Sequence, residues 1–126
     1  MREAFFVFLG GGIGSVLRYW TILAVHRWLP AGVFPLGVFT ANVLGSFTLG
    51  FLFALPIMRS RDHLAWLFMA TGVLGGYTTF STLANDSWQL LLGNQPWVAL
   101  LNTAGSIIAG TAAAALGWGL ARHVWP

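Results

Sequence analysis

Apolar residues gather in four long segments along the chain, with short polar stretches between them. The segments run from about Phe5 to Val25, Phe34 to Ile57, Leu64 to Leu92 and Trp97 to His123. A helix needs about 20 apolar residues to cross a bilayer, and each segment is long enough. The pattern predicts an all-α membrane protein with four transmembrane helices, which form one transmembrane domain over residues 1–126.

The third segment contains the densest group of polar residues in the chain. It reads GVLGGYTTFSTLAND from Gly72 to Asp86. One continuous helix over the whole segment would be roughly 43 Å long, whereas a bilayer core is about 30 Å thick. The pair Gly75-Gly76 and the β-branched pair Thr78-Thr79 favour a break near residues 75–79. Since unpaired polar groups are costly in hydrocarbon, this stretch should contact protein or line a wet cavity.

The composition agrees with a membrane location. Of the 126 residues, 57% are hydrophobic and 7% are charged, and the mean hydropathy is +0.76. A soluble domain carries about 25% charged residues. The positive charges are arginines that lie apart, so there is no basic stripe for nucleic acid. No pairing of a nucleophile with a base suggests catalysis, and we expect that the protein is not an enzyme.

The arginines also bear on orientation. Those on the side shared by both termini are Arg2, Arg59, Arg61 and Arg122, against Arg27 alone on the other side. Because cytoplasmic loops retain positive charge, this distribution favours termini inside the cell.

Three polar residues inside the other spans each have two interpretations. Arg18 either reaches back to the interface or stands in an aqueous vestibule, where it concentrates an anion. Asn42 either makes an interhelical hydrogen bond or presents its amide N–H groups to a dehydrated anion. Ser106 lies on a small-residue face with Gly110, so it serves either packing or a polar path. In the first span, Gly10 and Gly14 favour close helix packing.

The chemistry of the third segment favours a small ion as ligand. Hydroxyl and amide donors suit a small anion, and the positive edge of the Phe80 ring can assist. Unwound carbonyls between Gly75 and Thr78 suit a hard cation such as Na+. One chain supplies few such carbonyls, so we infer an oligomer.

The sequence resembles the small microbial fluoride channels of the Fluc or CrcB family over nearly its full length. The matching residues are Gly14 and Arg18, Gly37 to Asn42, Gly45, and G-x-x-G-G-x-T-T-F-S-T from Gly72 to Thr82. The resemblance implies an antiparallel (dual-topology) homodimer with two pores. It also implies one structural Na+ at the dimer centre, which is not transported and is held by the backbone carbonyls of Gly75 and Thr78.

The same resemblance implies a fluoride pathway and shows three departures from the family pattern. The pathway residues would be Phe80, Asn42, Ser81, Thr82 and Ser106, with Arg18 near a vestibule. Leu83 stands where the family usually has a second phenylalanine. Asp86 replaces a usual glutamate, and Asn102 replaces a frequent tyrosine.

The sequence therefore predicts a passive, fluoride-selective channel of the cytoplasmic (inner) membrane that lowers fluoride toxicity. Because the arginine count leans one way, an oppositely inserted paralogue is an alternative partner. A small multidrug or cation antiporter is the first rival. Such a protein needs a mid-membrane carboxylate to carry a proton, and this sequence does not offer one. A non-transporting assembly subunit is the second rival.

Overall fold

The structure is a computed structural model, and it describes residues 1–29, 32–56 and 64–125. All regular secondary structure within these ranges is helical. The expected end of the second span at Ile57 lies outside the described residues, as do Arg59 and Arg61 of the following loop.

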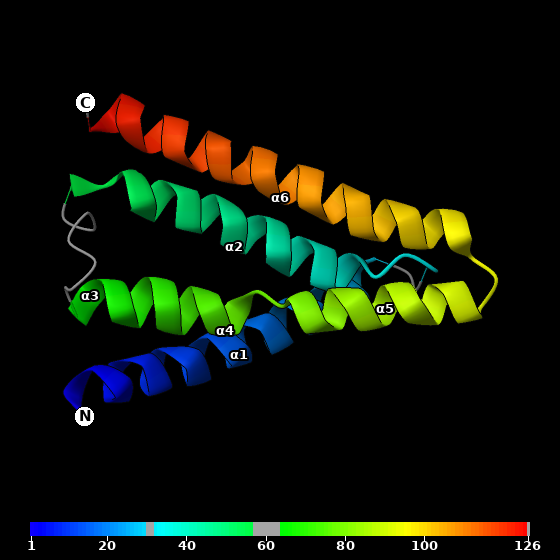
Figure 1. Cartoon of the computed structure of the whole chain (residues 1–126), viewed down its shortest axis with the longest axis horizontal. Helices are drawn as coiled ribbons and strands as arrows, with labels where there is room; N and C mark the ends of the chain where they lie inside the picture. Colours follow the sequence, from blue (N-terminus) through cyan, green and yellow to red (C-terminus); the bar gives the residue numbers. More distant parts are fainter. Residues whose placement is uncertain (30–31, 57–63, 126) are drawn as a thin grey trace.

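Three helices are long and apolar enough to cross a membrane. They are α1 (Arg2–Trp28), α2 (Leu36–Ala54) and α6 (Pro96–Val124). Figure 1 shows α2 running back toward the end at which α1 starts, and α6 ending at that same end, so both termini lie at one end of the molecule. Pro96 begins α6, where its missing N–H would have no intrahelical partner anyway.

The third apolar segment forms a row of shorter helices. The row consists of α3 (Leu64–Trp66), the π-helical stretch η2 (Leu67–Leu74), α4 (Gly75–Tyr77) and α5 (Phe80–Leu92). It is interrupted at Thr78 and Thr79, whose backbones are extended. The π-helical turn was not anticipated from the sequence.

The glycines of the third segment have a different role from the one expected. Gly75 and Gly76 are helical, and the chain extends only at the two threonines that follow. A methyl group at Gly76 would lie 2.5 Å from the carbonyl oxygen of Gly11. This glycine therefore allows α4 to approach α1, and the β-branched threonines, which favour extended backbone, form the break.

Close backbone contacts hold the row in place. Helix α1 packs against η2 and α4 on one side, while α2 packs mainly against α6, and α5 packs against α6. A methyl group at Gly14 would overlap the carbonyl oxygen of Val73, and one at Gly117 would overlap that of Phe47. Backbone thus meets backbone at both contacts, of which the first holds η2 against α1 and the second holds α6 against α2.

Candidate functional site

The site is built around the break between α4 and α5. Thr78 has φ −86° and ψ 156°, and Thr79 has φ −151° and ψ 118°. Thr79 caps α5, because its Oγ1 accepts a hydrogen bond from the backbone N–H of Thr82 at 3.2 Å. Such a cap satisfies one of the donors that a helix start leaves free.

Asn42 on α2 binds the extended backbone from the side. The N–H of Thr79 donates to Oδ1 of Asn42 at 2.8 Å, and Nδ2 of Asn42 donates to the carbonyl oxygen of Thr79 at 3.2 Å. The amide thus stands in for a neighbouring peptide group, which a broken helix needs in a membrane. The interhelical hydrogen bond, one of the two roles left open by the sequence, is present. The second N–H of the amide is a further donor.

Helix α1 reaches the break from the opposite side through two polar contacts. Nη1 of Arg18 donates to the carbonyl oxygen of Thr78 at 3.3 Å. The hydroxyl groups of Thr21 and Tyr77 lie 3.0 Å apart. Arg18 is half-buried, and its guanidinium is held at the break by the hydrogen bond to Thr78.

The hydroxyl groups after the break form a connected group. Oγ1 of Thr79 lies 3.2 Å from Oγ of Ser81 and 3.1 Å from Oγ1 of Thr82. Each hydroxyl can both donate and accept, so the three can rearrange their hydrogen bonds around a small polar ligand.

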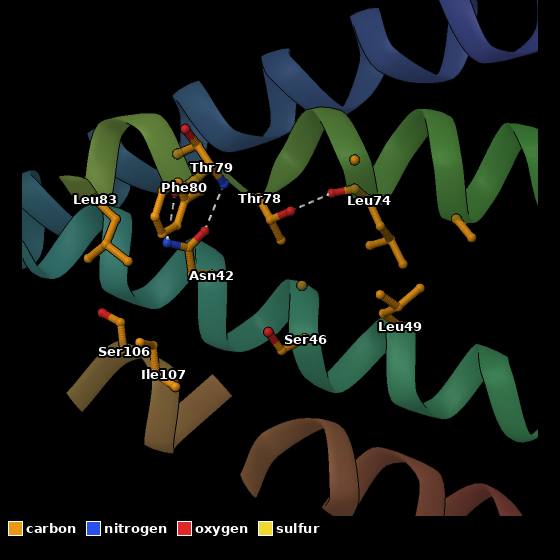
Figure 2. A pocket seen from close by; sticks show the side chains of 13 residues that line it. Asn42, Ser46, Leu49, Leu74, Thr78, Thr79, Phe80, Leu83, Ser106 and Ile107 are labelled. Carbon is orange, nitrogen blue, oxygen red and sulfur yellow. Dashed lines mark hydrogen bonds between the residues drawn. The ribbon is translucent and has the colours of Figure 1, made fainter. Parts of the chain in front are cut away.

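A cavity of about 320 Å³ lies beside the break. Figure 2 shows Asn42 and Phe80 on one part of its wall, with Leu83 and Ser106 nearby. The lining residues come from α2, the third-segment row and α6, and are Asn42, Gly45, Ser46, Leu49, Ala70, Leu74, Gly75, Thr78, Thr79, Phe80, Leu83, Ser106 and Ile107.

Five of the eight residues predicted for the fluoride pathway and the cation site line the cavity. Asn42, Phe80 and Ser106 line it together with Gly75 and Thr78. The remaining three are not lining residues and reach the break through hydrogen bonds. Ser81 and Thr82 bond through Thr79, and Arg18 bonds to Thr78.

Ser106 and Phe80 are exposed to very different degrees. Ser106 is buried, with 6% of its surface exposed, and its hydroxyl has no hydrogen-bond partner within the described ranges. Phe80 is 78% exposed although it lies inside an apolar segment. Leu83, at the position of the family's second phenylalanine, is buried with 5% exposed.

One buried polar cluster was missed by the sequence reasoning. Nδ2 of Asn102 and Oγ1 of Thr103 donate to Oγ of Ser87 at 3.0 and 2.9 Å. The Ser87 hydroxyl in turn donates to the carbonyl oxygen of Leu83 at 2.8 Å. The four-residue spacing of Asn102 and Ser106 on α6 was the available signal. It places both on the face that packs against α5.

A family model and several curated relatives match most of this chain. The family model described as CrcB-like protein, Camphor Resistance (CrcB), matches residues 5–118. A protein of Bacteroides fragilis is 44% identical over 95 residues, which is 74% of this chain and 75% of that protein. One of Flavobacterium psychrophilum is 36% identical over 98% of this chain and all of its own length. One of Helicobacter pylori strain Shi470 is 40% identical over 91% of this chain and 89% of its own.

Each of these three relatives is named a fluoride-specific ion channel FluC. Such relatives are ion channels and not enzymes, which confirms the prediction of a non-enzymatic protein. Together with the three apolar helices, they identify this chain as a multi-pass membrane protein. The family resemblance stated from the sequence is confirmed, and the chain belongs to the CrcB family.

Proposed function

We propose that this protein is a passive channel that exports fluoride across the cytoplasmic (inner) membrane and so lowers its toxicity. The observation that carries the proposal is a broken helix whose hydroxyl and amide groups border a cavity, in a chain whose relatives are named as fluoride-specific channels. Fluoride leaves down its electrochemical gradient, because the membrane potential drives an anion outward.

The donors beside the cavity can replace the hydration shell of a small anion. In the cavity wall they are the second N–H of Asn42 and the Ser106 hydroxyl, which has no partner among the described residues. The hydroxyls of Ser81 and Thr82 reach the same break through Thr79. The ring edge of Phe80 carries positive charge and adds to this set. A narrow path lined by such groups favours fluoride over chloride, since closely spaced donors fit the smaller ion.

Arg18 contributes a fixed positive charge near this path. Its guanidinium bonds at the break, and a cation at that depth raises the local concentration of an anion. Its placement in a vestibule remains a prediction.

The freed carbonyls at the break fit a structural Na+. The N–H of Thr79, which would bond the Gly75 carbonyl in a continuous helix, bonds Asn42 instead. The N–H of Thr82, the corresponding donor for the Thr78 carbonyl, bonds Thr79 Oγ1. Both carbonyl oxygens have lost their helical donors, and oxygen ligands of this kind suit Na+. When bound, the ion would supply positive charge that holds these carbonyls together.

One chain supplies too few oxygens to surround such an ion, and this favours a second copy. The 78% exposed ring of Phe80 fits the same conclusion. We propose an antiparallel homodimer of four-span subunits, in which the row from α3 to α5 spans the membrane in addition to α1, α2 and α6. Of the described arginines, Arg2 and Arg122 lie at the end with the termini and Arg27 at the other. An oppositely inserted paralogue is the alternative partner.

Fluoride efflux from liposomes tests the proposed activity. Purified protein is reconstituted with internal potassium fluoride, valinomycin is added to release the potassium, and a fluoride electrode records the efflux. We expect fast fluoride efflux with no proton gradient, and chloride efflux no faster than from protein-free liposomes. Equal rates for the two anions would reject the selectivity, and a requirement for a proton gradient would favour an antiporter.

Single-cysteine labelling tests the orientation. The chain has no cysteine, so Glu3→Cys at the exposed start of α1 introduces one thiol. An impermeant maleimide should label about half of the molecules in intact cells if both orientations are equally populated. Labelling of all molecules, or of none, would reject the dual-topology homodimer and favour a paralogue pair.

A further inference from the structure

Arg18 makes a contact that neither packing nor an anion vestibule requires. Its Nη1 lies 3.3 Å from the carbonyl oxygen of Thr78, in a half-buried contact between α1 and the break. Glu3 and Asp86 are the carboxylates within the described ranges, and neither bonds this guanidinium there. Glu3 is roughly 22 Å away along α1 at 1.5 Å per residue. The charge of Arg18 is therefore directed at a backbone oxygen.

That oxygen lies at an end of a helix that favours cations. The first half of the third segment ends at Tyr77, and the carbonyl end of a helix carries partial negative charge. The usual helical donor to the Thr78 carbonyl, the N–H of Thr82, is bonded to Thr79. A carbonyl oxygen has two lone pairs, so Arg18 uses one and leaves one.

We infer that Arg18 restricts the cation site at the break to monovalent ions. This inference rests on the proposed function, in which the carbonyls of Gly75 and Thr78 hold the structural cation. A cation bound to the Thr78 oxygen shares that atom with Arg18. Two positive charges that share one oxygen cannot be far apart. With Nη1 3.3 Å from that oxygen and a metal–oxygen bond of about 2.4 Å, the ion would lie about 6 Å from the guanidinium charge.

The repulsion at this separation is large enough to select by charge. At about 6 Å and an effective dielectric between about 20 and 40, each unit of cation charge weakens binding by roughly tenfold or more. A divalent ion experiences this repulsion twice. Ca²⁺ is the informative competitor, because it also binds backbone carbonyl oxygens, and the carbonyls alone would not reject it.

Two substitutions at one position separate charge from tethering. Arg18→Gln removes the charge, and because its amide nitrogen lies two bonds closer to the backbone than Nη1, it also loses the 3.3 Å hydrogen bond to the Thr78 carbonyl. Arg18→Lys keeps the charge on a shorter side chain with a different donor geometry. If Arg18 only ties α1 to the break, both variants should bind the cation more weakly. If its charge sets the selectivity, only the glutamine variant should change selectivity, and its Na+ binding should become tighter.

The readout is the thermal unfolding midpoint and dimer fraction of the purified protein, with no transport assay involved. Protein prepared in N-methylglucamine chloride is titrated with sodium chloride or calcium chloride at constant ionic strength, and unfolding is followed by tryptophan fluorescence. For the wild type we expect stabilisation by Na+, and a half-effective Ca²⁺ concentration at least tenfold higher. Arg18→Gln should lower the half-effective Na+ concentration about tenfold and make Ca²⁺ at least as effective as Na+. Arg18→Lys should behave as the wild type does.

Several results would overturn the inference. Equal stabilisation of the wild-type protein by Ca²⁺ and Na+ would overturn it. This test needs no variant, so it holds even if Arg18→Gln fails to fold. Unchanged cation selectivity in Arg18→Gln would do so as well. A wild type indifferent to Na+ would remove both the cation site and the inference, whereas loss of fluoride selectivity in liposomes would remove the proposed transport function and leave this result standing.

Discussion

The substitution Asn42→Asp tests the link between the helix break and ion passage. It keeps the shape of the side chain and the acceptor for the N–H of Thr79, which lies 2.8 Å from Oδ1. It replaces the donor to the Thr79 carbonyl, now at 3.2 Å, with a carboxylate oxygen that cannot donate. A backbone carbonyl then faces a negative charge inside the membrane-spanning region.

The structure allows both consequences to be estimated. Loss of the donor removes one of two hydrogen bonds to the Thr79 carbonyl, because the carbonyl of this capping residue also accepts the first bond of α5. The loss destabilises the protein by about 0.5–1.5 kcal/mol. The new charge also repels an anion in the cavity that Asn42 lines. For an ion passing about 5 Å away at an effective dielectric of about 20, the repulsion is roughly 3 kcal/mol, which slows passage about a hundredfold.

The assay is fluoride efflux from liposomes, normalised to the amount of folded protein in the same preparation. Asn94→Asp is the matched control, because it adds the same charge in the turn between α5 and α6, outside the helices. We expect efflux within twofold of the wild type for the control, and a fall of about a hundredfold for Asn42→Asp. Efflux equal to the wild type in Asn42→Asp, with intact protein, would mean that fluoride does not pass the cavity beside the break.

Three further substitutions test other parts of the site. Phe80→Ile should reduce fluoride efflux at least tenfold because the ring edge is lost, while Phe8→Ile, at a 75% exposed position on α1, should not; equal efflux from both would exclude the ring. Leu83→Phe should keep efflux at or above the wild-type rate, since it restores the family's second ring; a large loss of efflux from well-folded protein would contradict this. Gly14→Ala should destabilise the protein by more than about 1 kcal/mol, because its methyl group would overlap a backbone carbonyl oxygen across the interface. Gly12→Ala, with no neighbouring atom within 4 Å, should leave the unfolding midpoint unchanged or raise it, because alanine favours a helix more than glycine does. A similar midpoint for both glycine variants would argue against the close α1 packing.

The location of the break illustrates what local sequence can and cannot indicate. The length of the third segment and its cluster of polar residues indicated an interruption near residues 75–79. Local propensity could not say which residues would extend, because the glycines and the threonines both disfavour a helix. In the structure Gly76 stays helical where α4 packs closely against Gly11, and the extended backbone falls at Thr78 and Thr79.

The sequence by itself determined the membrane character, the apolar segments and the polar chemistry near the third segment's centre. These follow from composition and spacing, which act locally along the chain. Only the tertiary structure decided that Asn42 binds the extended backbone, that Arg18 bonds the Thr78 carbonyl, and that Ser87 meets Asn102. Each of these contacts joins different helices, and the free energy of such a contact depends on how the helices pack, which residue spacing within one segment does not encode.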